Sequence, residues 1–363
     1  MSTPRVTVLM SVYNGARYLD PAVQSILCQT WSDFELLVVD DGSTDESAAK
    51  LASYRDPRIR VIRTENRGVG AALATGVENA RGEFIARMDA DDISAPNRLE
   101  RQVAAMESMP EVGVLDAFAH MMDRQGRPLP DEEQEPFLGR AERRWRLLWR
   151  NAVIHPTVML RREVLTRTGL NYRARVVAED YDLWLRLMPH TEFHRLPERL
   201  LWYRRHADSV TAKWGQPHFE CLAAIIGESS QRFTNMSVSP ALAADLAFLT
   251  RQTYQRPEEY DPKSSTDELI ELMDRTYCAL SERFQPDPID AAGIRAEAAQ
   301  QLLDWAFLLE RCRTPPAGGT RSLAIAALTY RPGAVFSGYF VRHLVASAIG
   351  SRGLVHLRRA LNR

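Results

Sequence analysis

Aspartate residues follow two apolar runs of the chain, and their spacing is suited to holding a cation. Asp40 and Asp41 follow one run, and three acids follow the other on a single turn: Asp89, Asp91 and Asp92. Carboxylates crowded in this way repel one another unless a cation or a hydrogen-bonded ligand is present. Mg²⁺ and Mn²⁺ take oxygen ligands and often share their coordination with substrate phosphates. Aspartate also favours turns, but three acids on one turn indicate a divalent metal site.

Neither a dinucleotide-binding loop nor an EF-hand fits the spacing of these residues. A dinucleotide-binding fold requires G-x-G-x-x-G directly after the first strand, whereas this chain has Tyr13-Asn14-Gly15-Ala16-Arg17 there. An EF-hand requires a central glycine and a distal glutamate, which the acidic loop lacks. Asp45 is interpreted separately, as a helix cap.

Alternating strand and helix patterns over the first ninety residues must position these acids. The expected strands are 6–12, 34–39, 59–62 and 84–88, and the expected helices are 18–27, 45–54 and 69–79. This alternation predicts an α/β fold with a mostly parallel sheet flanked by helices. In such sheets ligands bind beyond the carboxyl ends of the strands. Both acidic clusters stand at those ends.

The chain has 363 residues, and this length favours two domains. Beyond residue 100 the sequence predicts helices at 97–108 and 181–188, a strand at 158–160 and a surface loop at 123–137. Residues 214–310 show helical periodicity throughout. The predicted domains are therefore 1–213, which carries the sheet, and 214–363, a helical accessory domain with a basic C-terminal segment. Trp145, Leu148 and Trp149 recur at helical spacing and predict a core-facing stripe.

The net charge of −1 hides an asymmetry: residues 311–363 hold nine arginines and no acid, whereas residues 1–310 hold 37 basic and 47 acidic residues. The basic segment is expected either to bind an anionic membrane surface or to pack on the acidic remainder. Four scattered cysteines without a C-x-x-C pair indicate reduced thiols. No apolar run reaches the ~18–20 residues of a membrane span, and no signal-peptide pattern begins the chain. We expect a cytoplasmic protein, with peripheral association at the cytosolic face of the membrane as an extension.

Several segments resemble the family 2 glycosyltransferases and occur in the order of that family over residues 4–212. They are Val6–Asn14, Gln29–Leu36, Val39–Asp45, Met88–Leu99, His155-Pro156-Thr157, Glu179–Leu185, and Tyr203-Arg204-Arg205-His206 followed by Ser209. Each segment is modest evidence, but the ordered set is specific. The resemblance implies a GT-A fold, a nucleotide-diphosphate sugar donor, inversion at the anomeric carbon, and Mn²⁺ or Mg²⁺ as cofactor.

The resemblance also assigns roles to residues. It implies that Ser11 and Tyr13 lie against the nucleotide base, that Asp41 accepts a hydrogen bond from a pyrimidine N–H, and that Asp89 lies near the ribose. The implied metal ligands are Asp91, acting through the diphosphate, and His206, whose neutral imidazole suits that role. Family members commonly carry Arg-Asn where this chain has Leu73-Ala74, which puts any donor contact from that pair in doubt.

Glu179 and Asp180 precede a predicted helix, where acids can act simply as caps. Within the resemblance Asp180 is the expected general base and Glu179 the alternative, because inverting transfer needs a carboxylate facing the acceptor hydroxyl. Asp182 points off another face of the helix and is not expected to act. His155 is expected either to orient the acceptor or to pack beside Pro156.

The expected reaction is sugar transfer to the hydroxyl of a glycan or lipid-linked acceptor, in bacterial cell-surface polysaccharide synthesis by family analogy. No nucleic-acid partner is expected. The alternative is a nucleotide-sugar-binding scaffold protein without transferase activity.

Overall fold

The computed structural model describes residues 3–131, 139–174, 177–206, 216–250, 259–312, 314 and 320–331. The chain forms two compact units. The first consists of residues 1–137 and 152–213, and the second of residues 138–151 and 214–363. The chain crosses from the first unit to the second at residues 213/214, the position of the predicted domain boundary. The segment 138–151, which the predicted domains place in the first, belongs to the second unit.

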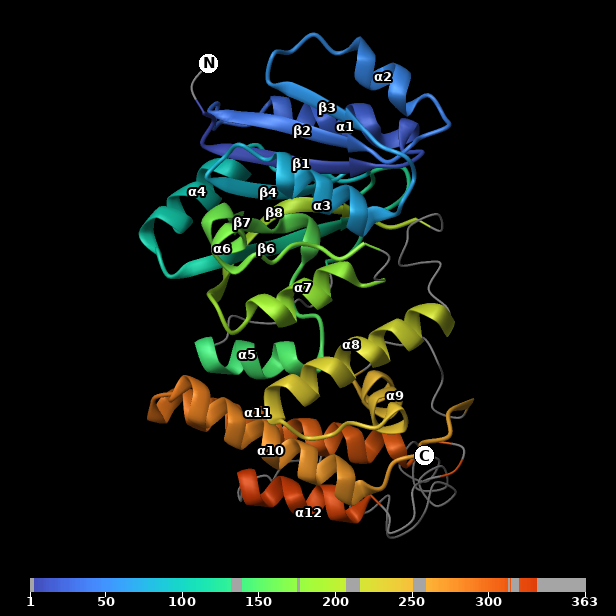
Figure 1. The fold of residues 1–363 in the computed structure, drawn as a ribbon, viewed down its shortest axis with the longest axis vertical. Coiled ribbons are helices and arrows are strands. Elements are labelled where there is room, and N and C mark those ends of the chain that lie inside the picture. Colours follow the sequence, from blue (N-terminus) through green and yellow to red (C-terminus); the bar gives the residue numbers. More distant parts are fainter. Residues whose placement is uncertain are drawn as a thin grey trace, which may run out of the picture. The chain divides into compact units, whose positions relative to one another are not determined.

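The first unit is built on one eight-stranded sheet in the order β3-β2-β1-β4-β7-β6-β8-β5 (Figure 1). Its strands are β1 (Val6–Val12), β2 (Phe34–Asp40), β3 (Ile59–Arg63), β4 (Phe84–Asp89), β5 (Ile93–Ser94), β6 (Val112–Met122), β7 (Met159–Arg161) and β8 (Glu192–Arg204). Strands β3, β2, β1 and β4 are parallel to one another, and β8 is parallel to β6. Strand β7 runs antiparallel to β4 and β6, and β5 antiparallel to β8. The sheet is therefore mixed: its parallel half carries the four strands predicted in the first ninety residues, and the strand predicted at 158–160 is the antiparallel β7.

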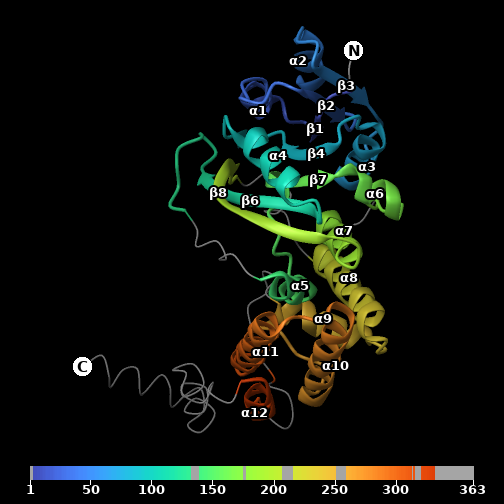
Figure 2. The same cartoon turned by 90° about the vertical axis from the view of Figure 1, so that its left-hand side faces the viewer.

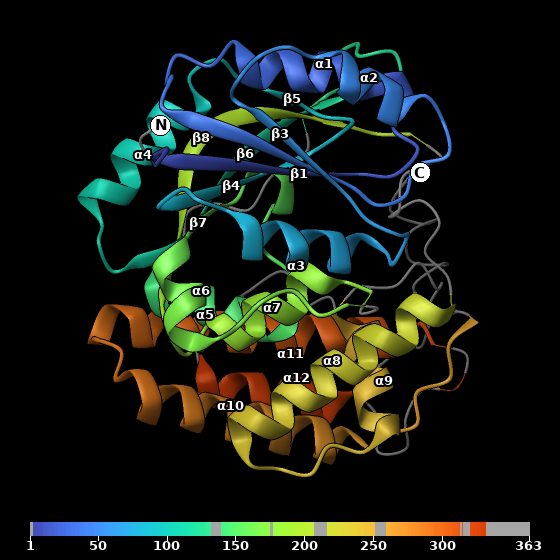
Figure 3. The ribbon, with the colours of Figure 1, turned by 45° about the horizontal axis from the view of Figure 1, so that its top comes forward.

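Helices flank the sheet of the first unit. They are α1 (Ala16–Leu27), α2 (Ser47–Ser53), α3 (Val69–Asn79), α4 (Arg98–Ser108), the 3₁₀ turn η1 (His155–Thr157), α6 (Arg162–Thr168) and α7 (Glu179–Leu187). Val8 and Met10 of β1 pack in one core with α1, α2 and α4. The alternate residue Leu9 faces α3, where a side chain at Gly76 would collide with it. Figure 3 shows α1 and α2 on one side of the sheet and α3 on the other. Coverage of both faces explains why β1 and β2 read as continuous apolar runs.

Strand β8 was not predicted from the sequence. Its thirteen residues alternate unevenly between buried and exposed positions and include Pro197 and several charges. A strand of this composition lacks the apolar run or strict period of two on which such predictions rest. The strand forms because it pairs with β6 over nearly its full length, a contact between distant residues that the sequence pattern does not show.

The second unit is helical throughout its described residues (Figure 2). Its helices are α5 (Arg140–Trp149), α8 (Gln216–Thr234), α9 (Pro240–Leu249), α10 (Thr266–Phe284), α11 (Pro288–Leu309) and α12 (Arg321–Tyr330). Trp149 stacks edge-on with Trp145 and Trp305 at ring-centroid distances of 5.6 and 5.2 Å, and Arg146 pairs with Glu297 of α11 at 2.8 Å. These contacts make α5 part of this unit and confirm the predicted tryptophan stripe as core.

Local signals set the helix starts in the second unit. Helix α10 begins after Ser265, whose hydroxyl accepts from Glu268 N while the Glu268 carboxylate accepts from Ser265 N, a reciprocal capping box.

In the described part of the chain no helix is long and apolar enough to cross a membrane. Most of the basic segment 311–363 lies outside the described residues, and its membrane docking stays a prediction.

Candidate active site

The acidic turn predicted to bind metal lies at the carboxyl end of β4. Among the described residues, Asp89, Asp91 and Asp92 each place a carboxylate oxygen within 4.8 Å of the others. Asp92 is buried and accepts a hydrogen bond from Arg204 N at 2.8 Å on one oxygen, while its other oxygen has no partner in the described structure. Burial raises the pKa of Asp92 well above its usual range, and the Asp91 and Asp89 carboxylates add to the effect. A bound cation would relieve this repulsion.

His206 joins this turn from a distant part of the sequence. Strand β8 delivers it, and its Nε2 lies 2.8 Å from Asp91 Oδ2. Arg204, two residues earlier, donates from Nε to the Asp91 carbonyl at 2.6 Å and so ties the end of β8 to the acidic turn. Carboxylate oxygens with one imidazole nitrogen form a donor set that Mn²⁺ accepts, and carboxylates with phosphate suit Mg²⁺. The residues present therefore fit the implied divalent ion.

Arg87 lies beside these acids and was missed by the sequence analysis. It stands two residues before Asp89 on β4, on the same face of the sheet, and the two side chains form an ion pair. Its side chain is buried, and its Nε has no hydrogen-bond partner among the described residues. Burial opposes the charged form, but the Asp89 carboxylate holds the pKa of Arg87 above its usual range. The sequence signal that could have identified Arg87 is a charged residue within an otherwise apolar strand that ends in the acidic turn.

A second acidic cluster gathers at the start of α7. His155, Glu179 and Asp180 place ligand atoms within 4.8 Å of one another. His155 Nδ1 lies 3.9 Å from Asp180 Oδ2, and its Nε2 lies 2.9 Å from the hydroxyl of Tyr172. Burial holds the pKa of His155 well below its usual range, so the ring is neutral. His155 thus lies with Asp180 rather than only beside Pro156, and Tyr172 is a neighbour that no sequence signal indicated.

The two carboxylates of this cluster differ from the neighbouring Asp182. Burial, followed by the charge of Asp180, raises the pKa of Glu179 to about 8, so Glu179 carries a proton at neutral pH. Asp182 is buried and bonded to Arg186 at 2.6 Å and to Arg173 at 3.3 Å. These ion pairs make Asp182 structural, in agreement with its predicted position on another face of the helix.

The carboxyl ends of β1 and β2 hold the residues expected at the nucleotide base. Ser11 pairs in register with Asp89 on β4, and the Tyr13 side chain is 51% exposed. The Asp41 carboxylate is buried and accepts hydrogen bonds from Thr64 Oγ1 at 3.2 Å, Arg67 N at 3.1 Å and Gly68 N at 2.8 Å. A carboxylate has about four acceptor positions, so one remains for a ligand.

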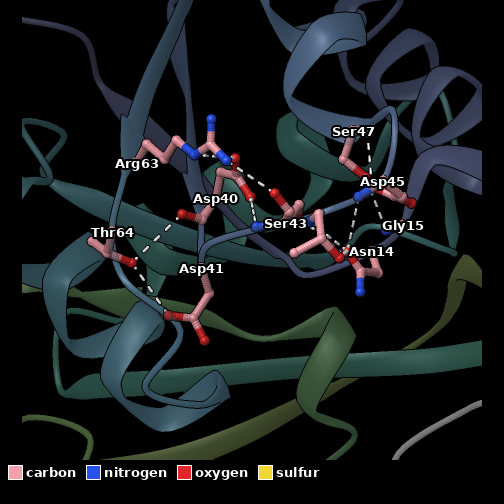
Figure 4. A network of polar contacts seen from close by, with 10 residues as sticks. Asn14, Gly15, Asp40, Asp41, Ser43, Asp45, Ser47, Arg63 and Thr64 are labelled. Atoms are coloured by element: carbon pink, nitrogen blue, oxygen red, sulfur yellow. Dashed lines mark hydrogen bonds and ion pairs between the residues drawn. The ribbon is translucent and has the colours of Figure 1, made fainter.

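Asp40 and Asp41 do not act as one cluster, although they are adjacent in sequence. Figure 4 shows their side chains pointing apart, with Asp40 toward Ser43 and Arg63 and Asp41 toward Thr64. Asp40 is buried, accepts from Ser43 N at 2.9 Å and pairs with Arg63 at 3.5 Å. Its carboxylate is therefore used inside the loop. Leu73, at the position where the family commonly has arginine, is fully buried and lies in the core.

Comparison with known proteins agrees with this architecture. The family model "Glycosyl transferase family 2" matches residues 7–169. The O-antigen biosynthesis glycosyltransferase WbnJ of Escherichia coli is 32% identical over 235 residues, which cover 63% of this chain and 90% of WbnJ. An uncharacterized glycosyltransferase of Methanocaldococcus jannaschii is 32% identical over 211 residues, covering 56% of this chain and 72% of the relative. Residues 1–349 of S. aureus TarS, solved in complex with UDP-GlcNAc, share the fold with a TM-score of 0.57 at 17% identity, over 91% of each chain.

The sheet, its acidic turn and these relatives define a glycosyltransferase with a GT-A fold followed by a helical C-terminal region. The chain belongs to glycosyltransferase family 2. It is an enzyme, and the predicted family and fold are confirmed.

Proposed function

We propose that the protein transfers a sugar, with inversion, from a nucleotide-diphosphate sugar to an acceptor hydroxyl, using Mn²⁺ or Mg²⁺. The observation that carries this proposal is the presence of two separate acidic groups at one edge of the sheet: the Asp89–Asp92 turn with His206, and the Glu179–Asp180 pair with His155. Inverting transfer requires one group to hold the leaving diphosphate and another to accept the proton of the attacking hydroxyl.

The first group suits the donor. Asp91 and His206 would hold the divalent ion, which neutralises the charge that develops on the leaving diphosphate. Asp89 would lie near the ribose, oriented by its ion pair with Arg87. Ser11, Tyr13 and the remaining acceptor position of Asp41 would bind the base.

The second group suits the acceptor. Asp180 is the proposed general base, because the raised pKa of Glu179 keeps the neighbouring carboxyl group protonated at neutral pH and Asp180 Oδ2 lies 3.9 Å from His155 Nδ1. The neutral His155, fixed through Tyr172, would orient Asp180 or the acceptor hydroxyl.

The proposed setting is cell-surface polysaccharide synthesis, since one relative is an O-antigen biosynthesis glycosyltransferase. The acceptor would be a glycan or a lipid-linked saccharide at the cytosolic face of the membrane. Residues 1–213 would carry the reaction, and residues from 214 onward would form the accessory domain, apart from the segment 138–151 that packs with it.

A thermal-shift screen of UDP-, GDP-, CDP- and dTDP-sugars, each with and without Mn²⁺, tests the proposal. A ligand present at about 100 times its Kd stabilises the native state by about 2.7 kcal/mol. A metal-dependent rise in melting temperature with at least one nucleotide-sugar is expected. Coupled assays of nucleoside diphosphate release then separate a transferase from a protein that only binds. If no nucleotide-sugar raises the melting temperature, the proposed function is wrong.

A further inference from the structure

Several hydrogen bonds join the turn after β1 to the loop after β2, and the Asn14 side chain makes three of them. Its Oδ1 accepts hydrogen bonds from Thr44 N at 2.8 Å, Thr44 Oγ1 at 3.3 Å and Asp45 N at 3.3 Å. Its backbone N–H donates to Ser43 Oγ at 3.0 Å. Figure 4 shows Asn14 facing this loop. One side chain therefore bonds to two successive residues of a neighbouring loop.

The backbone of Asn14 is suited to this position. Its φ is 52°, in the left-handed region, which asparagine tolerates better than most residues. Gly15 follows, and a side chain there would meet Val12 Cγ2 at 2.8 Å. The chain then enters α1, and Gly15 N donates to Ser47 Oγ at 3.0 Å while Ala16 N donates to Asp45 Oδ2 at 3.1 Å. The start of α1 and the loop before α2 thus form one bonded unit.

The far side of the loop is bonded in its turn. Ser43 N donates to Asp40 Oδ1 at 2.9 Å, and Arg63 donates to the Ser43 carbonyl at 2.9 Å. Gly42 lies between Asp41 and Ser43 and has a φ of 75°. Glycine adopts both positive and negative φ readily, so this residue does not by itself fix the conformation of the loop. Asn14 bonds to Thr44 and Asp45, the two residues that follow Ser43, and so restrains the loop on that side as well.

The consequence concerns the two residues adjacent to this network. Tyr13 immediately precedes Asn14, and about half of its side-chain surface is exposed. Asp41 lies two residues before Ser43. We propose that Asn14 is a positioning residue for the donor nucleotide, which fixes the spacing between the Tyr13 ring and the Asp41 carboxylate. This inference rests on the proposed function, since both residues are assigned there to the nucleotide base.

A positioning role predicts an effect on donor binding rather than on the chemical step. The four hydrogen bonds of Asn14 run to Ser43, Thr44 and Asp45 of the loop after β2, and none of these four involves the acidic turn or the Asp180 cluster. Preorganised loops bind ligands more tightly because less ordering remains to be done on binding, and a misplacement of about 1 Å can change a rate or affinity by about 100-fold. We expect loss of the bonds to Asn14 to weaken nucleoside diphosphate binding by about 10- to 100-fold and to change kcat by less than about threefold.

Three variants separate the side-chain bonds from the backbone strain. Asn14→Ala removes the acceptor oxygen and disfavours the left-handed backbone; Asn14→Gly removes the oxygen but accepts that backbone. Asn14→Asp keeps an oxygen for the same three donors. The matched control is Asn79→Ala, which removes an amide that donates within α3, to the Thr75 carbonyl at 2.8 Å.

The experiment is calorimetry of each full-length variant with UDP, GDP, CDP and dTDP in the presence of Mn²⁺. The values of kcat and donor KM are measured with the donor and acceptor that support transfer by the wild type. The inference predicts weak binding for Asn14→Gly and Asn14→Ala, recovery to within about fivefold of wild type for Asn14→Asp, and no change for Asn79→Ala. Wild-type affinity in Asn14→Gly, or a fall in kcat with unchanged KM, overturns it. If the wild type binds none of the four nucleotides, the proposed function fails as well, and the two failures are thereby distinguished.

Discussion

Glu179 tests which carboxyl group of the second acidic cluster is the general base. If Glu179 is protonated at neutral pH, its replacement should change the pH dependence of stability and leave the transfer rate unchanged. Burial and the Asp180 carboxylate raise the pKa of Glu179 from 4.5 to about 8. The native state therefore keeps a proton that the unfolded chain releases above pH 4.5. Glu179→Gln replaces the carboxyl group with a neutral side chain of nearly equal shape and removes this titration.

The sign of the effect follows from the raised pKa. Below pH 4.5 both states are protonated and Glu179 costs the native state nothing. Between pH 4.5 and 8 the unfolded state loses the proton first, so stability falls as pH rises, and above pH 8 the loss levels off. Each unit in that interval corresponds to about 1.4 kcal/mol, or about 5 kcal/mol in full. Because the side chain is partly exposed, solvent screening reduces this, and we expect about 1–2 kcal/mol.

The assay compares thermal unfolding of wild type and Glu179→Gln at pH 5 and pH 8. For a unit of this size, 1–2 kcal/mol corresponds to about 2–8 °C, so the variant should melt higher at pH 8 and close to wild type at pH 5. Glu163→Gln, an exposed glutamate in the first turn of α6, is the matched control. Transfer at pH 7 should stay within about threefold of wild type, since the residue it replaces is already neutral. An unchanged melting difference between the two pH values refutes the protonation argument, and a 100-fold loss of transfer assigns the base to Glu179.

Three further predictions concern the donor, the base and the C-terminus. Asp91→Asn should fold normally but lose Mn²⁺-dependent nucleoside diphosphate binding, and unchanged calorimetric affinity would contradict the metal assignment. Asp180→Asn should retain donor binding and lose about 10²–10⁴-fold in kcat, the usual effect of removing a general base; transfer at the wild-type rate would rule it out as the base. Full-length protein should sediment with anionic but not neutral liposomes, and a chain ending at Glu310 should not, since each arginine near such a surface contributes about 1 kcal/mol; equal sedimentation of both proteins would exclude this anchor.

Local patterns in the sequence were sufficient for the parallel half of the sheet and for the acidic turn. Strands β1, β2 and β4 are largely buried, so each appears as a mostly apolar run, and β2 and β4 each end in an aspartate. Their carboxyl ends meet at one edge because the connections between them are helices. That rule predicted that the acids after β2 and the acids after β4 stand at the same edge of the sheet. The helical character after residue 214 was equally visible, since it depends on periodicity within each helix.

Contacts between distant residues were decided only by tertiary structure. The pairing of β8 with β6 brings His206 to Asp91, 115 positions away, yet β8 has no strand-like pattern of its own. The separate orientations of Asp40 and Asp41 arise because successive residues at a strand end point to opposite sides, and only the surrounding loops determine which carboxylate faces a ligand. Helix α5 joined the second unit through Trp149 and its neighbours, although its sequence shows only that one face is apolar.

The ordered motifs of the chain indicated the family by resemblance, and composition with short-range spacing predicted the elements of the parallel sheet and the residue types available for chemistry. The tertiary structure decided which groups share a site and what charge they carry there. The contact of His206 with Asp91 joins groups from separate elements, and the raised pKa of Glu179 has burial as its main cause. Apolar runs predict which segments are buried, but the burial of single charged groups such as Glu179 depends on what the whole fold packs around them.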